Sequence, residues 1–161
     1  MKNIAFYLVL ALTLLPLRAQ AYDGVVDDVK AFYAEFAEGV TTGRRDDVIA
    51  LIEKHFSSDF KHIDDGELAY EKDGLLNQMK LVKDQPDLNE SFTINIESAA
   101  FDETSQEVHV VFVSESIVKE GDQELGRLNQ RCSDKLRVLD DQKTFELYEC
   151  DCVNLPVAEN N

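Results

Sequence analysis

The stretch HFSSDFKHIDDGELAYEKDGLLNQM (residues 55–79) decides the fold. Two short extended runs, DFKHI and ELAY, flank the DDG sequence at residues 64–66. An Asp-Gly pair between such runs predicts a tight β-hairpin, because both central residues of this turn need a positive φ angle. A helix is predicted after the hairpin, since Asp73 precedes apolar residues at helical spacing and the pattern stops before Pro86.

Two further helices are predicted before this stretch. Between Asp23 and Thr42, apolar residues recur three and four positions apart and form one helical face: Val25, Val29, Phe32, Phe36 and Val40. Gly43 is a typical helix stop. Asp46 can cap the next helix, whose apolar residues are Val48, Ile49, Leu51, Ile52 and Phe56.

Four longer strands are predicted after the third helix. The segments SFTINIESAAF, EVHVVFVSESIVK, LGRLNQRCSDKLRVL and TFELYECDCV have the patterns of strands. Their links, DETSQ, EGDQE and DDQK, are short and rich in turn-forming residues. Because short links join antiparallel neighbours, these segments predict an antiparallel meander.

The order helix, helix, two short strands, helix, four long strands resembles the NTF2-like superfamily, which includes the SnoaL and ketosteroid isomerase relatives. Three passages carry the resemblance: FAEGVTTGRRDDVIALI, HFSSDFKHIDDG and YEKDGLLNQM. It implies an α+β cone in which three N-terminal helices pack in a curved antiparallel β-sheet. On this basis we expect one NTF2-like domain over residues 22–153 and a flexible tail over residues 154–161.

The resemblance also implies a pocket at the open end of the cone. In isomerase-like members an aspartate after the first strand is the general base, and Asp64 matches that position. A second acid, kept neutral by an apolar site, donates a hydrogen bond to the developing oxyanion, and Asp134 matches it. In that family a tyrosine hydroxyl from the first helix also donates to the oxyanion, but its position falls on Phe36, which has no hydroxyl. Lys135 would favour the ionised form of Asp134, which is the wrong state for donating. Asp64 also suits a turn, and we favour that interpretation over a catalytic base.

Three residues are expected to line the pocket: Phe36, His62 and Tyr70. His62 lies on a short predicted strand at a position that can point inward. His55 and His62, with Asp59 between them, do not have a usual ligand spacing across a helix–strand junction, so no metal site is predicted. The sequence contains no glycine-rich phosphate loop and no nucleophile motif. No cofactor is predicted.

The N-terminal sequence MKNIAFYLVLALTLLPLRAQAYDG has the features of a signal peptide. Lys2 precedes an apolar run, and Ala19-Gln20-Ala21 places small residues at both positions that a signal peptidase reads. The apolar run is shorter than the roughly 20 residues that a spanning helix needs. We therefore expect cleavage of residues 1–21 before Tyr22, a secreted or periplasmic protein, and no membrane span after cleavage.

The chain is strongly acidic, with a formal net charge of −16 over 161 residues. The charge is more negative without the N-terminal segment, which contains Lys2 and Arg18 and no acidic residue. This balance argues against binding of nucleic acid or of an anionic membrane surface.

The chain contains three cysteines, Cys132 and the pair Cys150 and Cys152 in the sequence ECDC. In an oxidising compartment two of them pair and one is left over. A regular last hairpin would place Cys132 opposite Asp151, and a one-residue bulge would bring it opposite Cys150 or Cys152. We predict a disulfide from Cys132, with Cys152 favoured over Cys150. A zinc site would lack a fourth ligand, and a Cys-x-Cys disulfide would be strained.

These features favour a non-enzymatic domain that binds a small apolar ligand or serves as an accessory protein. One alternative is a small-molecule isomerase, cyclase or hydrolase that uses the Asp64 carboxylate. The other is a protein-interaction module that forms a homodimer through the outer face of the sheet. Catalysis is the less favoured option, because the catalytic set is incomplete.

Overall fold

A computed structural model describes residues 24–83, 85, 88–139 and 144–156. Its elements follow in this order: a first helix over residues 24–41, α2 (Arg45–His55), β1 (Phe56–Asp64), β2 (Glu67–Glu71), α3 (Lys72–Lys83), β3 (Leu88–Asp102), β4 (Glu107–Glu120), β5 (Gln123–Val138) and β6 (Phe145–Asn154). The predicted α+β order of three helices and six strands is confirmed.

The six strands form one sheet in the order β2-β1-β6-β5-β4-β3. The meander from β3 to β6 and the β1–β2 hairpin are antiparallel, as predicted. β1 and β6, however, pair in parallel, so the sheet is mixed and the prediction of an antiparallel sheet was wrong. These two strands are far apart in the chain and no tight turn joins them, so nothing forces them to run in opposite directions.

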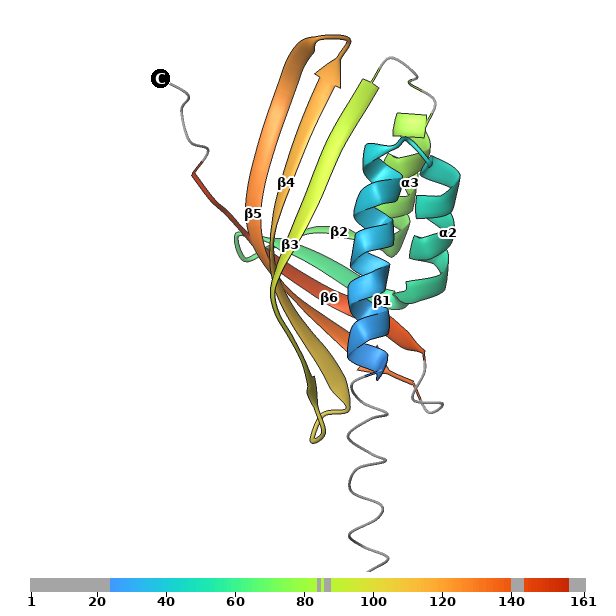
Figure 1. Cartoon of the computed structure of the whole chain (residues 1–161), viewed down its shortest axis with the longest axis vertical. Helices are drawn as coiled ribbons and strands as arrows, with labels where there is room; N and C mark the ends of the chain where they lie inside the picture. The colour runs from blue at the N-terminus through green and yellow to red at the C-terminus, as the bar shows by residue number, and fades with distance from the viewer. Residues whose placement is uncertain (1–23, 84, 86–87, 140–143, 157–161) are drawn as a thin grey trace, which may run out of the picture.

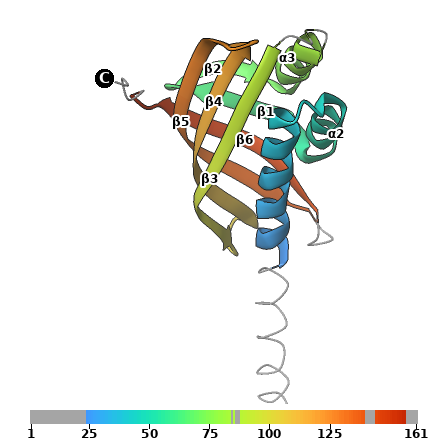
Figure 2. The ribbon, with the colours of Figure 1, turned by 45° about the horizontal axis from the view of Figure 1, so that its top comes forward.

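All three helices lie on the same side of the sheet (Figures 1 and 2). The long strands β3, β4 and β5 curve, and the register of each antiparallel pair in the meander shifts once. Such bulges bend a sheet locally. The core fills the space between the helices and the sheet, and several of its side chains are completely buried: Val29, Val48, Ile52, Val108, Val110 and Leu136.

The local turn and cap chemistry agrees with the sequence in some places and corrects it in others. Asp65 and Gly66 both have positive φ, as the predicted hairpin turn requires, and Gly43 ends the first helix with a φ of 72°. Asp46 is not the N-cap of α2: the cap is Arg44, which makes no side-chain capping bond. Asp46 instead lies in the first turn, where its carboxylate interacts favourably with the positive end of the helix dipole.

The two ends of the predicted domain lie at the limits of the described residues. The predicted signal peptide lies outside the described residues, as do residues 157–161. β6 extends to Asn154, and the Leu155 amide donates to the Asn129 carbonyl (2.8 Å), so the ordered sheet reaches slightly into the predicted tail. No helix among the described residues is long and apolar enough to cross a membrane.

Candidate functional site

A cavity of about 350 Å³ lies between the helices and the sheet. The first helix, α3 and all six strands contribute side chains to its wall. The five residues that the sequence singled out for a pocket or for catalysis all line it: Phe36, His62, Asp64, Tyr70 and Asp134. Side chains from distant parts of the sequence therefore meet at one cavity.

Most of the cavity wall is aromatic or aliphatic. Phe36 stacks against Phe56 with the ring centroids 6.3 Å apart, and it meets Phe92 edge-on at 6.1 Å. Phe60 and Phe112, both buried, extend this wall onto β1 and β4. The position that lacks the expected tyrosine hydroxyl thus contributes apolar surface.

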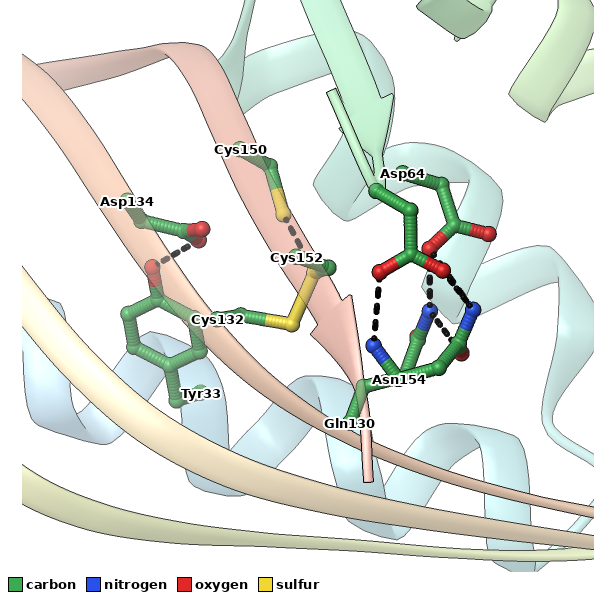
Figure 3. The surroundings of a disulfide bond; sticks show 9 residues. Tyr33, Asp64, Gln130, Cys132, Asp134, Cys150, Cys152 and Asn154 are labelled. Atoms are coloured by element: carbon green, nitrogen blue, oxygen red, sulfur yellow. Dashed lines mark hydrogen bonds between the residues drawn. A yellow bond between two sulfur atoms is a disulfide. The ribbon is translucent and has the colours of Figure 1, made fainter. Parts of the chain in front are cut away.

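A tyrosine hydroxyl nevertheless reaches Asp134, from Tyr33 one helical turn earlier. Tyr33 donates a hydrogen bond to Oδ2 of Asp134, and both side chains are buried (Figure 3). Burial raises the pKa of Asp134 to about 6, although hydrogen bonds from the Cys150 thiol and the Tyr33 hydroxyl act in the opposite direction. Burial and the adjacent carboxylate raise the pKa of Tyr33 well above its usual value. Asp134 is therefore an acid that changes charge near pH 6 inside the cavity.

Lys135 does not influence Asp134 in the way that the sequence suggested. Neighbours on a strand point to opposite faces, and the Lys135 ammonium pairs instead with Glu149 at 2.7 Å. Lys135 is half-exposed, whereas Asp134 is only 2% exposed. Burial, and not a nearby cation, controls the Asp134 carboxyl.

The cysteines lie beside this acid. Cys132 and Cys152 face each other across β5 and β6 and form a disulfide (Figure 3). A register shift next to Leu136 brings them opposite each other, which is the bulge that the sequence required. Cys150, the free thiol, is buried opposite Asp134, and its Sγ lies 3.5 Å from Sγ of Cys152. Burial, with the nearby Asp134 carboxylate, raises the pKa of Cys150 well above its usual value.

Asp64 forms a second polar cluster in the same cavity. Its Oδ1 accepts hydrogen bonds from Nε2 of Gln130 (3.1 Å) and Nδ2 of Asn154 (3.3 Å) (Figure 3). Asn154 also donates to Oδ2 of the neighbouring Asp65 (2.7 Å), and the Asp65 amide donates to the Cys152 carbonyl (2.9 Å). Asp64 therefore belongs both to the cavity wall and to the network that ties the hairpin turn to the end of β6.

His62 lies on β1 opposite Cys150. Its ring stacks on Tyr70 with the centroids 4.4 Å apart and the planes nearly parallel. Burial lowers the pKa of His62, which favours the neutral imidazole, although the nearby Asp64 and Asp151 carboxylates act in the opposite direction. His55, the other histidine considered, stacks on Phe145 and does not line the cavity. The structure thus separates the two histidines and brings His62 to the cysteines.

The charged side chains that line the cavity are all acidic. Asp64, Glu90 and Asp134 contribute carboxylates, and no lysine or arginine is among the described residues of the lining. The charged groups of the lining are therefore carboxylates, and protonation of Asp134 makes the cavity less negative.

The sequence matches no protein-family model and no curated protein. Solved structures do resemble the fold. An NTF2-like protein from Cytophaga hutchinsonii is 12% identical with a TM-score of 0.57, over 80% of this chain and 97% of the other. A ketosteroid isomerase-like protein from Erwinia carotovora atroseptica is 12% identical with a TM-score of 0.56, over 80% and 94%. The chain has the NTF2-like fold.

ActVI-ORFA from Streptomyces coelicolor shares the NTF2-like architecture as well, at 10% identity and a TM-score of 0.59, over 81% of this chain and 98% of the other. The predicted superfamily resemblance is confirmed at the level of the fold. At such low identities the likeness says nothing about activity, because one fold carries many functions. The function has to be argued from the cavity itself.

Proposed function

We propose that this protein binds one small, mainly apolar molecule in its cavity and is not an enzyme. The cavity itself carries this proposal, because it combines aromatic walls with a few converging polar groups. Its volume of about 350 Å³ lies within the range of about 300–1,000 Å³ that is usual for small-molecule sites.

The polar groups of the cavity indicate which ligands fit. The carboxylates of Asp64, Glu90 and Asp134 can accept hydrogen bonds, and the described lining holds no lysine or arginine. Glu90 also pairs with the buried Arg45 behind the lining at 3.2 Å, so Asp64 and Asp134 are the carboxylates of the lining that face no cationic partner there. A ligand with a hydroxyl or an amine would complement these acceptors. An organic anion would be repelled, since burial of an unpaired charge beside a like charge is costly. The ligand class is therefore a neutral or cationic molecule with an apolar body and a hydrogen-bond donor.

Isomerase-like catalysis is less well supported by the same residues. With a pKa of about 6, Asp134 is mostly ionised at neutral pH, and the ionised carboxylate accepts hydrogen bonds and does not donate one to an oxyanion. Asp64 accepts hydrogen bonds from the amides of Gln130 and Asn154, so its carboxylate is already engaged within the protein. Tyr33, the hydroxyl that Phe36 lacks, is already engaged with Asp134.

We also propose that the protein is exported and cleaved before Tyr22. The N-terminal sequence motivates this proposal, and a disulfide is typical of oxidising compartments. The intact mass of protein purified from the native host would correspond to a chain beginning at Tyr22; a chain that retains residues 1–21 would contradict it. Dimerisation through the outer face of the sheet stays a prediction, which light scattering at several concentrations would test.

The ligand proposal can be tested with sets of compounds that share one aromatic scaffold. Each set contains the hydrocarbon, the alcohol, the amine and the carboxylate, and calorimetry measures their affinities at pH 8. We expect the amine and the alcohol to bind more tightly than the hydrocarbon, and the carboxylate to bind weakest. Preferential binding of the carboxylates would contradict the proposal, as would a cavity that binds none of the compounds and is empty by native mass spectrometry.

Two tryptophan variants on β3 supply a test and its matched control. Ile94 lines the cavity, whereas Thr93 is exposed on the other face of the same strand. Ile94→Trp fills part of the cavity and should weaken binding by more than about tenfold, which is about 1.4 kcal/mol. Thr93→Trp should leave the affinity unchanged. Equal effects of the two variants would place the binding site elsewhere.

A further inference from the structure

The three cysteines and His62 gather on the face of the sheet that the helices cover. Cys150 and Cys152 are two residues apart on β6, so their side chains share one face. One donor atom each from His62, Cys150 and Cys152 lies within 4.8 Å of the other two. Cys132 on β5 is opposite Cys152 and bonded to it. Four side chains that bind metals therefore converge from three adjacent strands.

We propose that reduction of the Cys132–Cys152 disulfide opens a zinc site formed by Cys132, Cys150, Cys152 and His62. In the disulfide form two of the sulfurs are bonded to each other and leave only Cys150 and His62 as ligands. In the reduced form the set becomes three thiolates and one imidazole, which is a usual set for structural zinc. The disulfide and the zinc ion are thus alternative cross-links at the same place.

The spacing of the sulfurs suits this metal. Zinc binds sulfur at about 2.3 Å in a tetrahedron, so two ligand sulfurs lie about 3.8 Å apart. Sγ of Cys150 and Sγ of Cys152 are already 3.5 Å apart. The ring of His62 is held by its stacking on Tyr70. The acidic lining of the cavity also favours a cation over an anion.

Reduction of the Cys132–Cys152 disulfide needs an external reductant, which is a dithiol or a phosphine. Reduction adds two electrons and two protons to the disulfide and yields the thiols of Cys132 and Cys152. A dithiol reductant becomes a disulfide itself, whereas a phosphine becomes a phosphine oxide with oxygen from water, which also supplies the two protons. Zinc then displaces the protons of the three thiols, and no further electron moves. Three sulfur ligands select zinc over magnesium and calcium, which prefer oxygen.

The test compares oxidised and reduced full-length chain. The protein is reduced with a phosphine, and the reductant is removed in the absence of oxygen. The reduced chain is then titrated with Co²⁺, because its thiolate charge-transfer bands and visible bands report a tetrahedral site with sulfur ligands. Zn²⁺ is added last, in competition with Co²⁺. We expect the reduced chain to bind one ion with these bands, and Zn²⁺ to displace it. The oxidised chain should bind at least about 100-fold more weakly, because loss of even an outer-shell partner costs about 10–100-fold.

Variants identify the ligands. Cys150→Ser leaves the disulfide pair in place and should weaken metal binding by the reduced chain by at least about 100-fold. His62→Gln should also weaken it and should change the cobalt spectrum. His109→Gln is the matched control, since His109 alternates with the buried residues of β4 on the outer face and should bind metal as the parent chain does.

Folding of the reduced chain is followed by circular dichroism. If reduction unfolds the chain, Zn²⁺ should restore the native spectrum, and Mg²⁺ should not. A second route avoids the disulfide: Cys132→Ser, kept reduced, should still bind zinc through its three remaining ligands, although more weakly than the reduced parent chain. Failure of both chains to bind zinc or to refold with it would overturn the proposal. Equal binding by the oxidised chain, or unchanged binding by the Cys150→Ser and His62→Gln variants, would overturn it as well.

Discussion

Asp64 and Asp134 line the same cavity but are held in opposite ways. Asp134 on β5 is buried between Tyr33 and the Cys150 thiol, and burial raises its pKa to about 6. Asp64 on β1 is half-buried and accepts hydrogen bonds from Gln130 and from the last residue of β6. One carboxylate is thus dominated by desolvation and the other by hydrogen bonding.

The difference separates a carboxylate that stabilises the fold from one that does not. A buried acid whose pKa is raised costs folding free energy whenever it is ionised. A carboxylate that joins a turn to a strand end contributes to folding free energy instead. Asp134 is therefore the residue whose presence at this position calls for a functional explanation, such as a contact with the ligand.

The largest effect expected from this comparison comes from Asp134→Asn. A pKa of about 6 in the folded chain and an ordinary value of 3.8 correspond to a cost of up to about 3 kcal/mol. The raised pKa means that the cost is absent below about pH 4, grows between pH 4 and 6 and is complete above pH 6. The asparagine can still accept the Tyr33 hydrogen bond, so the variant should be more stable than the parent by about 2–3 kcal/mol at pH 8 and nearly equal at pH 4. Urea unfolding of the oxidised protein at both pH values measures this difference.

Asp64→Asn is the control, because it removes the same charge from the same cavity. It should not stabilise the protein at pH 8. If both variants gained the same stability, relief of the overall negative charge would explain the gain, and the special position of Asp134 would be refuted. The same stability gain at pH 4 would also contradict the assigned pKa.

The features that local sequence could predict are those decided by neighbours in the chain. The Asp65-Gly66 turn, the helix stop at Gly43 and the order of the elements follow from local chemistry, and the structure agrees with them. The disulfide could also be predicted, because the last hairpin limits Cys132 to two partners. The N-cap of α2 was predicted wrongly, because Asp46 can occupy either the cap or the first turn and the structure places it in the first turn.

Contacts between distant segments could not be predicted in the same way. The parallel pairing of β1 with β6 brings His62 beside Cys150, although these residues are 88 positions apart in number and no turn joins their strands. Tyr33 and Asp134 are separated by 101 positions. The resemblance assigned the tyrosine position to Phe36, but residues one helical turn apart share a face, and only the packed structure shows which one reaches the acid.

The second effect in size is expected from Tyr33→Phe. This variant removes the hydroxyl that donates to Asp134, so the pKa of Asp134 should rise further above 6. Hydrogen bonds to charged groups contribute about 1.5–3 kcal/mol, and we expect a loss of about 2 kcal/mol at pH 8 that shrinks at pH 4, where Asp134 is neutral. Unfolding free energies measured across this pH range test both the loss and its pH dependence.

Tyr70→Phe provides the comparison for that hydroxyl. Tyr70 lines the same cavity, and burial raises its pKa as well, but its hydroxyl makes no hydrogen bond to a described residue. Its removal should change stability by less than about 0.5 kcal/mol. In the Asp134→Asn background, Tyr33→Phe should cost less than it does alone; an equal cost would show that the hydroxyl and the carboxylate are not coupled.

The smallest effect concerns the other carboxylate. Asp64→Asn keeps an oxygen that can accept from Gln130 or Asn154, but it loses the charge that strengthens these bonds. We expect a loss of about 1 kcal/mol, measured by urea unfolding at pH 8, and no change in the affinity for a ligand that contacts Asp134. The Asn154 side chain donates to both Asp64 and Asp65, so weakening its bond to Asp64 should loosen the end of β6. Hydrogen exchange at the Asn154 amide, which donates to Oδ1 of Asp65, should then quicken. A gain in stability, or unchanged hydrogen exchange at the end of β6, would mean that Asp64 does not hold the hairpin to β6. The inference that Asp64 stabilises the fold, in contrast to Asp134, would then be wrong.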